Sequence, residues 1–278
     1  MSRLPDRSWT THGVRLRRAR RTPGPWHWLF FPGGPGIGSE SLRELVDTAD
    51  CPGTSWLVDL PGDGSNVAAP GAPDDPYALW PRVLLEAVDA VPNPVAVGHS
   101  TGGEYLLSVP GLEERLAGLV LVSTAPYAGW MPTFGAMCEA DPLPEVAAAT
   151  ECYEADPTDD NLAGIAVASA PWNFTVDGLA AGRDLLARMP YNRLAVEWSD
   201  QHFDRQYAAS WFPATTPTLI LSGGADRIVD QSLWDDPRYR GDNVRHVVVE
   251  GGAHFLWMER PEAVRQAFAG FASTLSPR

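Results

Sequence analysis

The chain contains 278 residues, of which 21 are basic and 35 acidic, and every basic residue is an arginine. Without lysine there is no amine for the phosphate contact of a P-loop, for the strand lysine of a protein kinase or for a Schiff base. The formal net charge of −14 argues against nucleic acid and anionic membranes as partners, because both are negatively charged. The length suits one large domain, or a core domain with an inserted module.

The cellular location and the cofactor requirement are inferred from what the sequence lacks. Cys51, Cys138 and Cys152 follow no metal-binding or redox spacing, so a reducing compartment is the simpler prediction. The N-terminal segment MSRLPDRSWT has no apolar run of the kind found in signal peptides. Nowhere do about 18 consecutive apolar residues, enough for a membrane span, occur. We therefore predict a cytoplasmic protein with no membrane association, no metal and no organic cofactor.

The first distinctive segment along the chain is a run of arginines between residues 15 and 21. Apolar residues alternate with them, which is typical of an edge strand whose charges prevent pairing with another sheet. We predict a solvated edge strand carrying Arg15, Arg17, Arg18, Arg20 and Arg21. A nucleic-acid-binding arm is the alternative interpretation.

Short apolar runs then alternate with longer amphipathic segments. The apolar runs predict strands at 26–31, 55–60, 94–98, 118–123, 217–222 and 244–250. Helices are predicted at 39–47, at 76–91 with Asp75 as its cap and Pro76 at its first position, at 101–109, between the last two strands, and at 261–274. This alternation predicts an α/β fold, with a mostly parallel sheet and helices on both faces.

The alternation is interrupted once, between residues 127 and 212. This segment is helical, irregular and rich in tryptophan, tyrosine and acidic residues. We interpret it as a helical lid inserted into a core domain that is formed by residues 1–126 and 213–278. The lid segment carries thirteen acids against four arginines, a net charge of −9. Solvated helix faces explain this acidity most simply, and an acidic pocket wall that attracts a substrate amine is the alternative.

A candidate nucleophile lies in residues 98–102 (GHSTG), which fit the pattern G-x-S-x-G between a short strand and a helix. Such a turn is sharp, and its two glycines let the strand and the helix approach each other closely. The hydroxyl of Ser100 then projects at the carboxyl edge of the sheet. The backbone amide of Thr101, at a helix N-terminus, points to where an oxyanion develops. An ordinary turn serine is the alternative.

A serine needs a base, and six histidines are available. His254 follows a late strand within the flexible loop GGAHFLWMERPE, which makes it our candidate. The others are placed less favourably: two lie in strand runs, one near the start, one in the turn itself and one in the lid, namely His27, His246, His12, His99 and His202.

The acid that would orient this base is expected just past the end of another strand. Asp226 lies just past the end of the strand LILS, after two glycines and an alanine, and Asp230 lies four residues further on. We choose Asp226, because Asp230 is in a position to cap the next helix. The resulting order along the chain is Ser100, Asp226 and His254, which is the order expected for an α/β-hydrolase.

A second oxyanion donor is expected in the loop after an early strand. Residues 32–36 (PGGPG) expose backbone amides that no side chain covers. We choose the amide of Gly34, with Gly33 as the alternative. A nucleotide-binding loop is excluded here, because the spacing is not G-x-G-x-x-G.

Five segments in order, FFPGGPG, VDLPGDGSN, VGHSTGG, LILSGGADR and GGAHFLWMERP, give the chain a resemblance to the α/β-hydrolase superfamily over about residues 12–275. Within it, the GGPG loop resembles the proline iminopeptidase group, which cleaves N-terminal residues from peptides. Pro32 replaces the histidine of that group's H-G-G-P-G motif, and Thr101 replaces its usual tryptophan. The group's lid glutamates, which bind the substrate amine, match no local motif here.

The predicted function is that of a serine hydrolase that cleaves an ester or amide through an acyl-enzyme. A small molecule or a short peptide is the expected substrate, and Gly33, Trp130, Trp172 and Trp198 are candidate contacts for it. An N-terminal aminoacyl or peptide bond is one candidate target. The alternatives are an esterase, lactonase or thioesterase, an acyl-transferring or cyclising enzyme, and a non-catalytic binding protein of the same fold.

Overall fold

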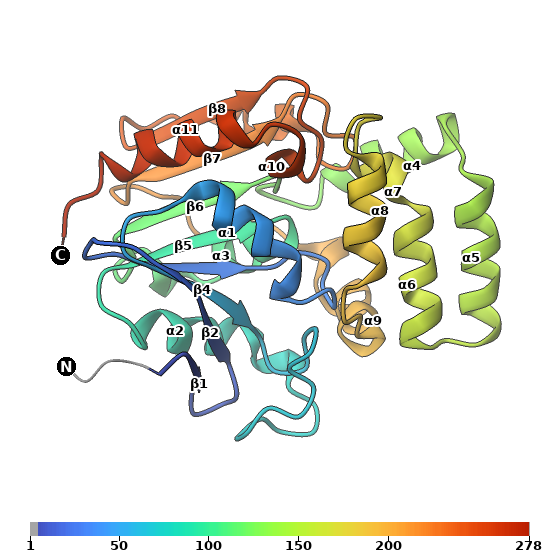
Figure 1. Ribbon diagram of the computed structural model, residues 1–278, viewed down its shortest axis with the longest axis horizontal. Helices are drawn as coiled ribbons and strands as arrows, with labels where there is room; N and C mark the ends of the chain where they lie inside the picture. Colours follow the sequence, from blue (N-terminus) through green and yellow to red (C-terminus); the bar gives the residue numbers. More distant parts are fainter. Residues whose placement is uncertain (1–4, 278) are drawn as a thin grey trace.

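A computed structural model describes residues 5–277; residues 1–4 and 278, the ends of the predicted core, lie outside it. Within this range eight strands form one sheet in the order β1-β2-β4-β3-β5-β6-β7-β8. The strands from β4 to β8 in this order are parallel neighbours, whereas β1 and β2 pair antiparallel with each other and β2 pairs antiparallel with β4. The mostly parallel sheet predicted from the sequence is therefore confirmed (Figure 1).

The central strands are buried along their whole length. The strands are β1 (Arg7–Trp9), β2 (Arg15–Arg21), β3 (His27–Phe31), β4 (Thr54–Asp59), β5 (Pro94–His99), β6 (Gly118–Val122), β7 (Thr218–Gly223) and β8 (Val244–Val249). Every residue of β4, β5, β6 and β7 is buried. Continuous apolar runs are what a parallel strand needs when helices cover both faces of the sheet.

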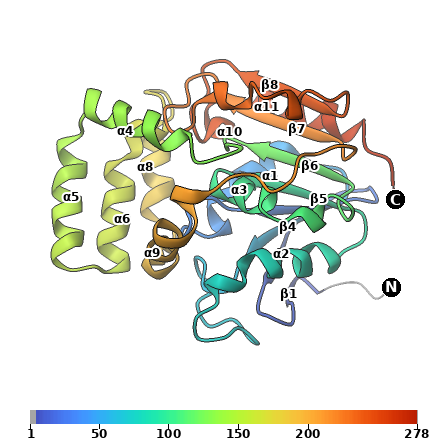
Figure 2. The same ribbon diagram turned by 180° about the vertical axis from the view of Figure 1, so that it is seen from behind.

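Two groups of helices cover the two faces. One face carries α1 (Arg43–Ala49), α10 (Leu256–Glu259) and α11 (Pro261–Ala272), and the other carries α2 (Trp80–Asp89) and α3 (Thr101–Leu107). Alternate residues of β3 separate accordingly: Trp28 and Phe30 pack with the first group, Leu29 and Phe31 with the second. Figures 1 and 2 show these two layers from opposite sides.

Three predicted helices differ from the sequence-based expectation. The predicted helix at 39–47 begins as a 3-10 turn, η1 (Ser39–Leu42), and becomes α-helical at Arg43. The predicted helix at 76–91 begins as a 3-10 turn, η2 (Tyr77–Leu79), and becomes α-helical only at Trp80. Pro81 in the first turn of α2 has no amide hydrogen and marks this later start. Between β7 and β8 only the 3-10 turns η5 (Gln231–Trp234) and η6 (Pro237–Tyr239) form. Asp230 and Asp236 each cap one of these turns, and Pro237 starts the second.

The helices between β6 and β7 lie together at one end of the sheet (Figures 1 and 2). They are α4 (Trp130–Ala140), α5 (Pro144–Ala155), α6 (Asp159–Ala168), α7 (Ala170–Asn173), α8 (Leu179–Ala187) and α9 (Arg193–His202). We call this group the lid; it falls inside the predicted insertion at 127–212. Among residues 5–277, no helix combines the length and the apolar character that crossing a membrane requires.

The prediction for the arginine-rich strand is wrong. β2 is not a solvated edge strand, because β1 pairs along part of it and β4 pairs on its other side. Arg15 is 7% exposed, and Arg15 and Arg17 both form ion pairs with Asp59, whose side chain is fully buried. A buried carboxylate requires such partners. These two arginines therefore serve the fold at the end of β4.

Candidate active site

The turn between β5 and α3 holds Ser100 in a strained backbone conformation, with φ 51° and ψ −128°. The glycines on either side allow close packing. A Cβ added to Gly98 would lie 2.5 Å from the Cα of Gly103, and one added to Gly102 would lie 2.4 Å from the carbonyl oxygen of Pro32. These contacts explain why residues 98 and 102 are glycines, and the sharp turn places Ser100 at the end of β5.

His254 and Asp226, predicted as base and acid, lie together. Nδ1 of His254 is 3.0 Å from Oδ2 of Asp226, and the two side chains are 5% and 0% exposed. The other oxygen of Asp226 accepts hydrogen bonds from the amides of Ile228 and Val229, at 2.8 and 3.1 Å. Asp226 is thus held by its own turn, with one oxygen left for the imidazole. Asp230 instead accepts a hydrogen bond from the amide of Ser232, as its predicted capping role requires.

Ser100 and His254 line the same cavity. Since Nδ1 of His254 faces Asp226, Nε2 is the ring nitrogen left for a proton transfer. Within residues 5–277, neither this nitrogen nor the Ser100 hydroxyl has a hydrogen-bond partner. Catalytic hydrogen bonds often tighten only when substrate is bound, so both groups are free to meet a reacting carbonyl.

The loop that carries His254 is fastened at three successive points. Nε2 of His99 donates to the carbonyl oxygen of His254 at 3.2 Å, and the amide of His254 donates to the carbonyl oxygen of Asn173 at 3.2 Å. The amide of Ala253 donates to Glu259 at 2.6 Å. Burial holds the pKa of His99 well below its usual value. His99 is therefore a neutral donor to the backbone of His254.

The glycine loop after β3 supplies amides beside the serine. The amides of Gly33, Gly34 and Thr101 make no hydrogen bond within the described part of the chain. A Cβ on Gly33 would lie 2.6 Å from Cβ of Ser100 and 3.3 Å from its Oγ, whereas a Cβ on Gly34 would first meet Ile37 at 3.0 Å. Both glycines line the cavity, and Gly33, our second choice, is the one packed against Ser100.

The cavity has a volume of about 300 Å³ and lies between the glycine loop, the turn of Ser100 and the lid. Its lid wall is largely apolar and includes Trp130, Phe134, Leu162, Ile165, Leu186 and Val196. The polar residues Ser41, Ser169, Asn173 and Tyr191 also line the cavity. None of the lining residues is an aspartate, a glutamate or an arginine. The lid side of the cavity is thus apolar and carries no acidic or arginine side chain.

Of the four predicted substrate contacts, two line this cavity and two do not. Gly33 and Trp130 belong to the lining. Trp172 lies edge-on to Phe134 and donates its indole N–H to the carbonyl oxygen of Asp141. Trp198, on the lid helix α9, packs against Tyr77 and Trp80 of the core. Trp172 and Trp198 therefore support the walls, a role that tryptophan content alone does not distinguish from substrate contact.

One buried carboxyl near the site was not identified from the sequence. Glu104 on α3 is 2% exposed, and its Oε2 has no hydrogen-bond partner among the described residues. Burial, followed by the Asp204 carboxylate, raises the pKa of Glu104 well above its usual range. Glu104 does not line the cavity, and nothing in its local sequence signals that it is buried.

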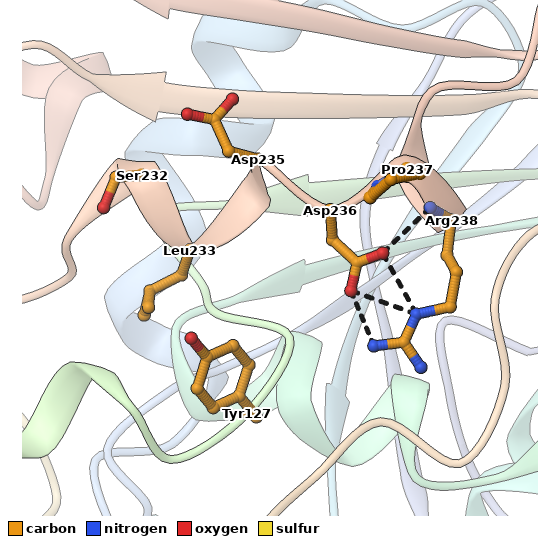
Figure 3. Close-up of a pocket in the computed structure, with 7 residues that line it drawn as sticks. All are labelled: Tyr127, Ser232, Leu233, Asp235, Asp236, Pro237 and Arg238. Carbon is orange, nitrogen blue, oxygen red and sulfur yellow. Dashed lines mark hydrogen bonds and ion pairs between the residues drawn. The ribbon is translucent and has the colours of Figure 1, made fainter.

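A second hollow, of about 410 Å³, lies beside Tyr127 where the chain enters the lid. Figure 3 shows Asp236 and Arg238 paired across its edge, and no residue of the Ser100 site is among those that line it. The Arg238 guanidinium lowers the pKa of the Asp236 carboxyl through this hydrogen bonding. Both acids that line this hollow are paired with an arginine, Asp236 with Arg238 and Asp235 with Arg240. No cluster of three potential metal ligands occurs within residues 5–277.

Comparison with known proteins agrees with this fold. A family model described as the alpha/beta hydrolase family matches residues 11–267. The chain therefore belongs to the α/β-hydrolase family. No curated protein sequence matches it significantly.

Solved structures share its fold at low sequence identity. The chain is similar to a proline iminopeptidase from Mycobacterium smegmatis, with TM-score 0.64, 18% identity, and 94% of this chain and 95% of the other covered. It is similar to a thermophilic esterase from Thermogutta terrifontis, with TM-score 0.64, 20% identity, and coverage of 96% and 97%. An alpha/beta fold family hydrolase from Bacillus anthracis str. Sterne gives TM-score 0.72, 13% identity, and coverage of 95% and 98%. At these identities the comparison establishes the fold alone.

Proposed function

We propose that the protein is a serine hydrolase that cleaves a carboxylic ester or amide through an acyl-enzyme. Oγ of Ser100 attacks the carbonyl carbon while Nε2 of His254 takes the hydroxyl proton, and the amides of Thr101 and of Gly33 or Gly34 stabilise the oxyanion. His254 then gives this proton to the leaving group. In the second half, water attacks the acyl-serine, His254 takes a proton from the water, and Ser100 recovers it as the carboxylic acid departs.

The observation that carries this proposal is the position of His254. One ring nitrogen is 3.0 Å from a buried carboxylate, and the imidazole lines the same cavity as a serine with positive φ. A buried imidazole whose Nδ1–H is held by an aspartate presents Nε2 as a base and gains stabilisation when it becomes charged. An ordinary turn serine, the alternative interpretation, has no need of this arrangement.

The cavity favours an uncharged, apolar acyl group. A substrate with a free ammonium group would have to lose its hydration in a space without a carboxylate among its lining residues. Burying an unpaired charge in this way costs several kcal/mol. We therefore prefer a carboxylic ester over an N-terminal aminoacyl bond, although one protein of similar fold is named a proline iminopeptidase and another a proline iminopeptidase-related protein.

Turnover of a panel of p-nitrophenyl esters and aminoacyl p-nitroanilides tests this preference. We expect the esters of short to medium apolar acids to be hydrolysed, and Ser100→Ala to lower kcat by about 10³-fold or more. Ser232→Ala, a change at an exposed serine, serves as the matched control and should leave kcat unchanged. Equal turnover by Ser100→Ala and the wild type would contradict the proposed nucleophile. Rapid cleavage of aminoacyl anilides with no cleavage of esters would contradict the substrate class.

The same panel separates hydrolysis from acyl transfer. With an added alcohol or amine, a hydrolase still releases mainly the free acid, whereas an acyltransferase forms the corresponding ester or amide. We expect the free acid as the main product, detected by mass spectrometry. A transfer product that dominates at millimolar acceptor would identify the acyl-transferring alternative.

A further inference from the structure

A buried carboxyl group outside the Ser100, His254 and Asp226 set contacts the glycine loop. Asp63 lies in the tight turn after β4 and is 2% exposed. Its Oδ1 accepts a hydrogen bond from the amide of Gly36 at 2.9 Å. Gly36 is two residues from Gly34 and three from Gly33, the two glycines that line the cavity together with Ser100.

The two loops are packed backbone to backbone at this point. A Cβ on Gly64 would lie 2.4 Å from the Cα of Gly38, and one on Gly38 would lie 2.9 Å from the Cα of Gly64. Gly38 and Gly64 both have positive φ, at 75° and 49°. Because the two loops lie this close, the side chain of Asp63 in the loop after β4 can reach the backbone amide of Gly36 in the glycine loop.

Gly36 is also joined to the lid. Its carbonyl oxygen accepts a hydrogen bond from the amide of Asn192 at 2.8 Å, and the side chain of Asn192 caps α9 by accepting from the amide of Ala195. Both backbone groups of Gly36 are thus engaged. One is bound to the core through Asp63, and the other is bound to the start of a lid helix.

In the described part of the chain, the Asp63 carboxyl has no positively charged partner, and its polar contacts are with backbone amides such as that of Gly36. Within residues 5–277 it forms no ion pair, whereas its neighbour Asp59 is paired with Arg15 and Arg17. The other titratable groups that act on it or feel its charge are Glu40, Tyr77 and Tyr105. Burial, followed by the Asp59 carboxylate, raises the pKa of Asp63 to about 7, against the lowering effect of the Gly36 and Gly64 amides.

We propose that Asp63 is a positioning residue, which holds the glycine loop through the amide of Gly36 so that the Gly33 and Gly34 amides face the oxyanion. This inference rests on the proposed function. Burying an unpaired carboxyl lowers the stability of the fold. A role in holding the loop that stabilises the transition state explains why this carboxyl is present. A displaced loop would weaken transition-state stabilisation more than substrate binding, so its loss should appear in kcat and hardly in KM.

Steady-state kinetics of Asp63→Ala and Asp63→Leu, which remove the acceptor at two different side-chain sizes, test the proposal. The substrate is a p-nitrophenyl ester whose turnover is lost in Ser100→Ala. We expect kcat to fall by about 10- to 100-fold with KM within about threefold. Asp74→Ala, at an exposed aspartate of the same loop, should match the wild type. An unchanged kcat in either variant, with a wild-type circular dichroism spectrum, would overturn the proposal.

Asp63→Asn keeps an acceptor oxygen but cannot ionise. This variant tests the positioning role if neither Asp63→Ala nor Asp63→Leu folds. Below pH 6, where Asp63 is protonated, its kcat should equal that of the wild type. Above pH 8 the wild type has a charged acceptor, which binds an amide more strongly, and its kcat should exceed that of Asp63→Asn by about two- to fivefold. A ratio of one at every pH would overturn the proposal.

These results are distinguishable from a failure of the proposed function. If the wild type hydrolyses no ester, or if Ser100→Ala is as active as the wild type, the nucleophile assignment is wrong. If ester turnover depends on Ser100 but is insensitive to Asp63, the hydrolase assignment stands and the positioning role is wrong.

Discussion

At the scale of single residues, two aspartates four positions apart have different tasks. Asp226 directs one oxygen at His254, whereas Asp230 caps the turn that follows. The two aspartates differ because β7 ends at Gly223. Asp226, just past this end, faces the loop after β8 that carries His254, whereas Asp230 lies beyond it. The chemistry of the site therefore depends on the strand end as much as on the residue type.

This pair gives a matched test of the acid. Asp226→Asn should lower kcat by about 10³- to 10⁴-fold, because an amide at this position favours the wrong tautomer of His254. Asp230→Asn should leave kcat within about twofold, since asparagine caps helical turns as well as aspartate. Ester hydrolysis by the purified variants measures both. A comparable loss in the two variants would assign the role to the loop as a whole and not to Asp226.

At the scale of elements, the lid is fastened to both loops of the site. Asn192 joins it to the glycine loop, and Asn173 joins it to the backbone of His254. Glu259, in α10, holds the lid and the histidine loop together. One of its oxygens accepts from the amide and hydroxyl of Thr175, both at 2.6 Å, and the other accepts from the amide of Ala253 at 2.6 Å. The lid is thus a part of the site and not only its cover.

We predict that Glu259→Ala lowers kcat by about tenfold and the free energy of unfolding by about 2–3 kcal/mol, because three donors lose a charged acceptor. Glu259→Gln should lose less of both. Glu262→Ala, at an exposed position on the next helix, is the control. Kinetics combined with urea denaturation separates the two effects, and a loss of stability with an unchanged kcat would show that Glu259 serves the fold alone.

At the scale of the whole molecule, the acidity of the chain is a property of its surface. Several lid acids pair with arginines, among them Glu145 with Arg183 and Asp200 with Arg205. None of the lid acids lines the cavity. This distribution favours the interpretation of solvated helix faces over that of an acidic pocket wall. Two of the buried carboxyls, Asp63 and Glu104, form no ion pair within residues 5–277, and burial raises the pKa of both.

The free energy of unfolding should depend on pH because of Asp63. Its pKa rises from 3.8 to about 7 on folding, so between these values the folded state binds more protons than the unfolded state. Stability from this group is therefore greatest at low pH and declines as pH rises toward 7. Relative to Asp63→Asn, the wild type should lose about 2–4 kcal/mol of unfolding free energy between pH 4.5 and 8. A pH-independent difference in urea denaturation would contradict the burial of an ionisable Asp63.

The sequence identified the features that are local in the chain. The turn of Ser100, the strand end of Asp226, the loop of His254 and the glycine loop each have a short pattern with a physical reason. Features that depend on distant contacts were missed. The arginines of β2 look like an exposed strand until Asp59, more than 40 residues away, is placed beside them. Asp63, Glu104 and Glu259 have no local pattern, and tryptophans that pack cannot be told from tryptophans that bind.

The central claim is that Ser100 is an activated nucleophile, and covalent labelling with a fluorophosphonate tests it most directly. Incubation of the wild type should attach one phosphonyl group, which peptide mass spectrometry locates on Ser100. The rate of labelling should fall by about 10²-fold or more in a His254→Ala variant, because the serine then lacks its base. Ser232→Ala should label like the wild type. A wild type that is not labelled, or a label that persists in Ser100→Ala, would contradict the account.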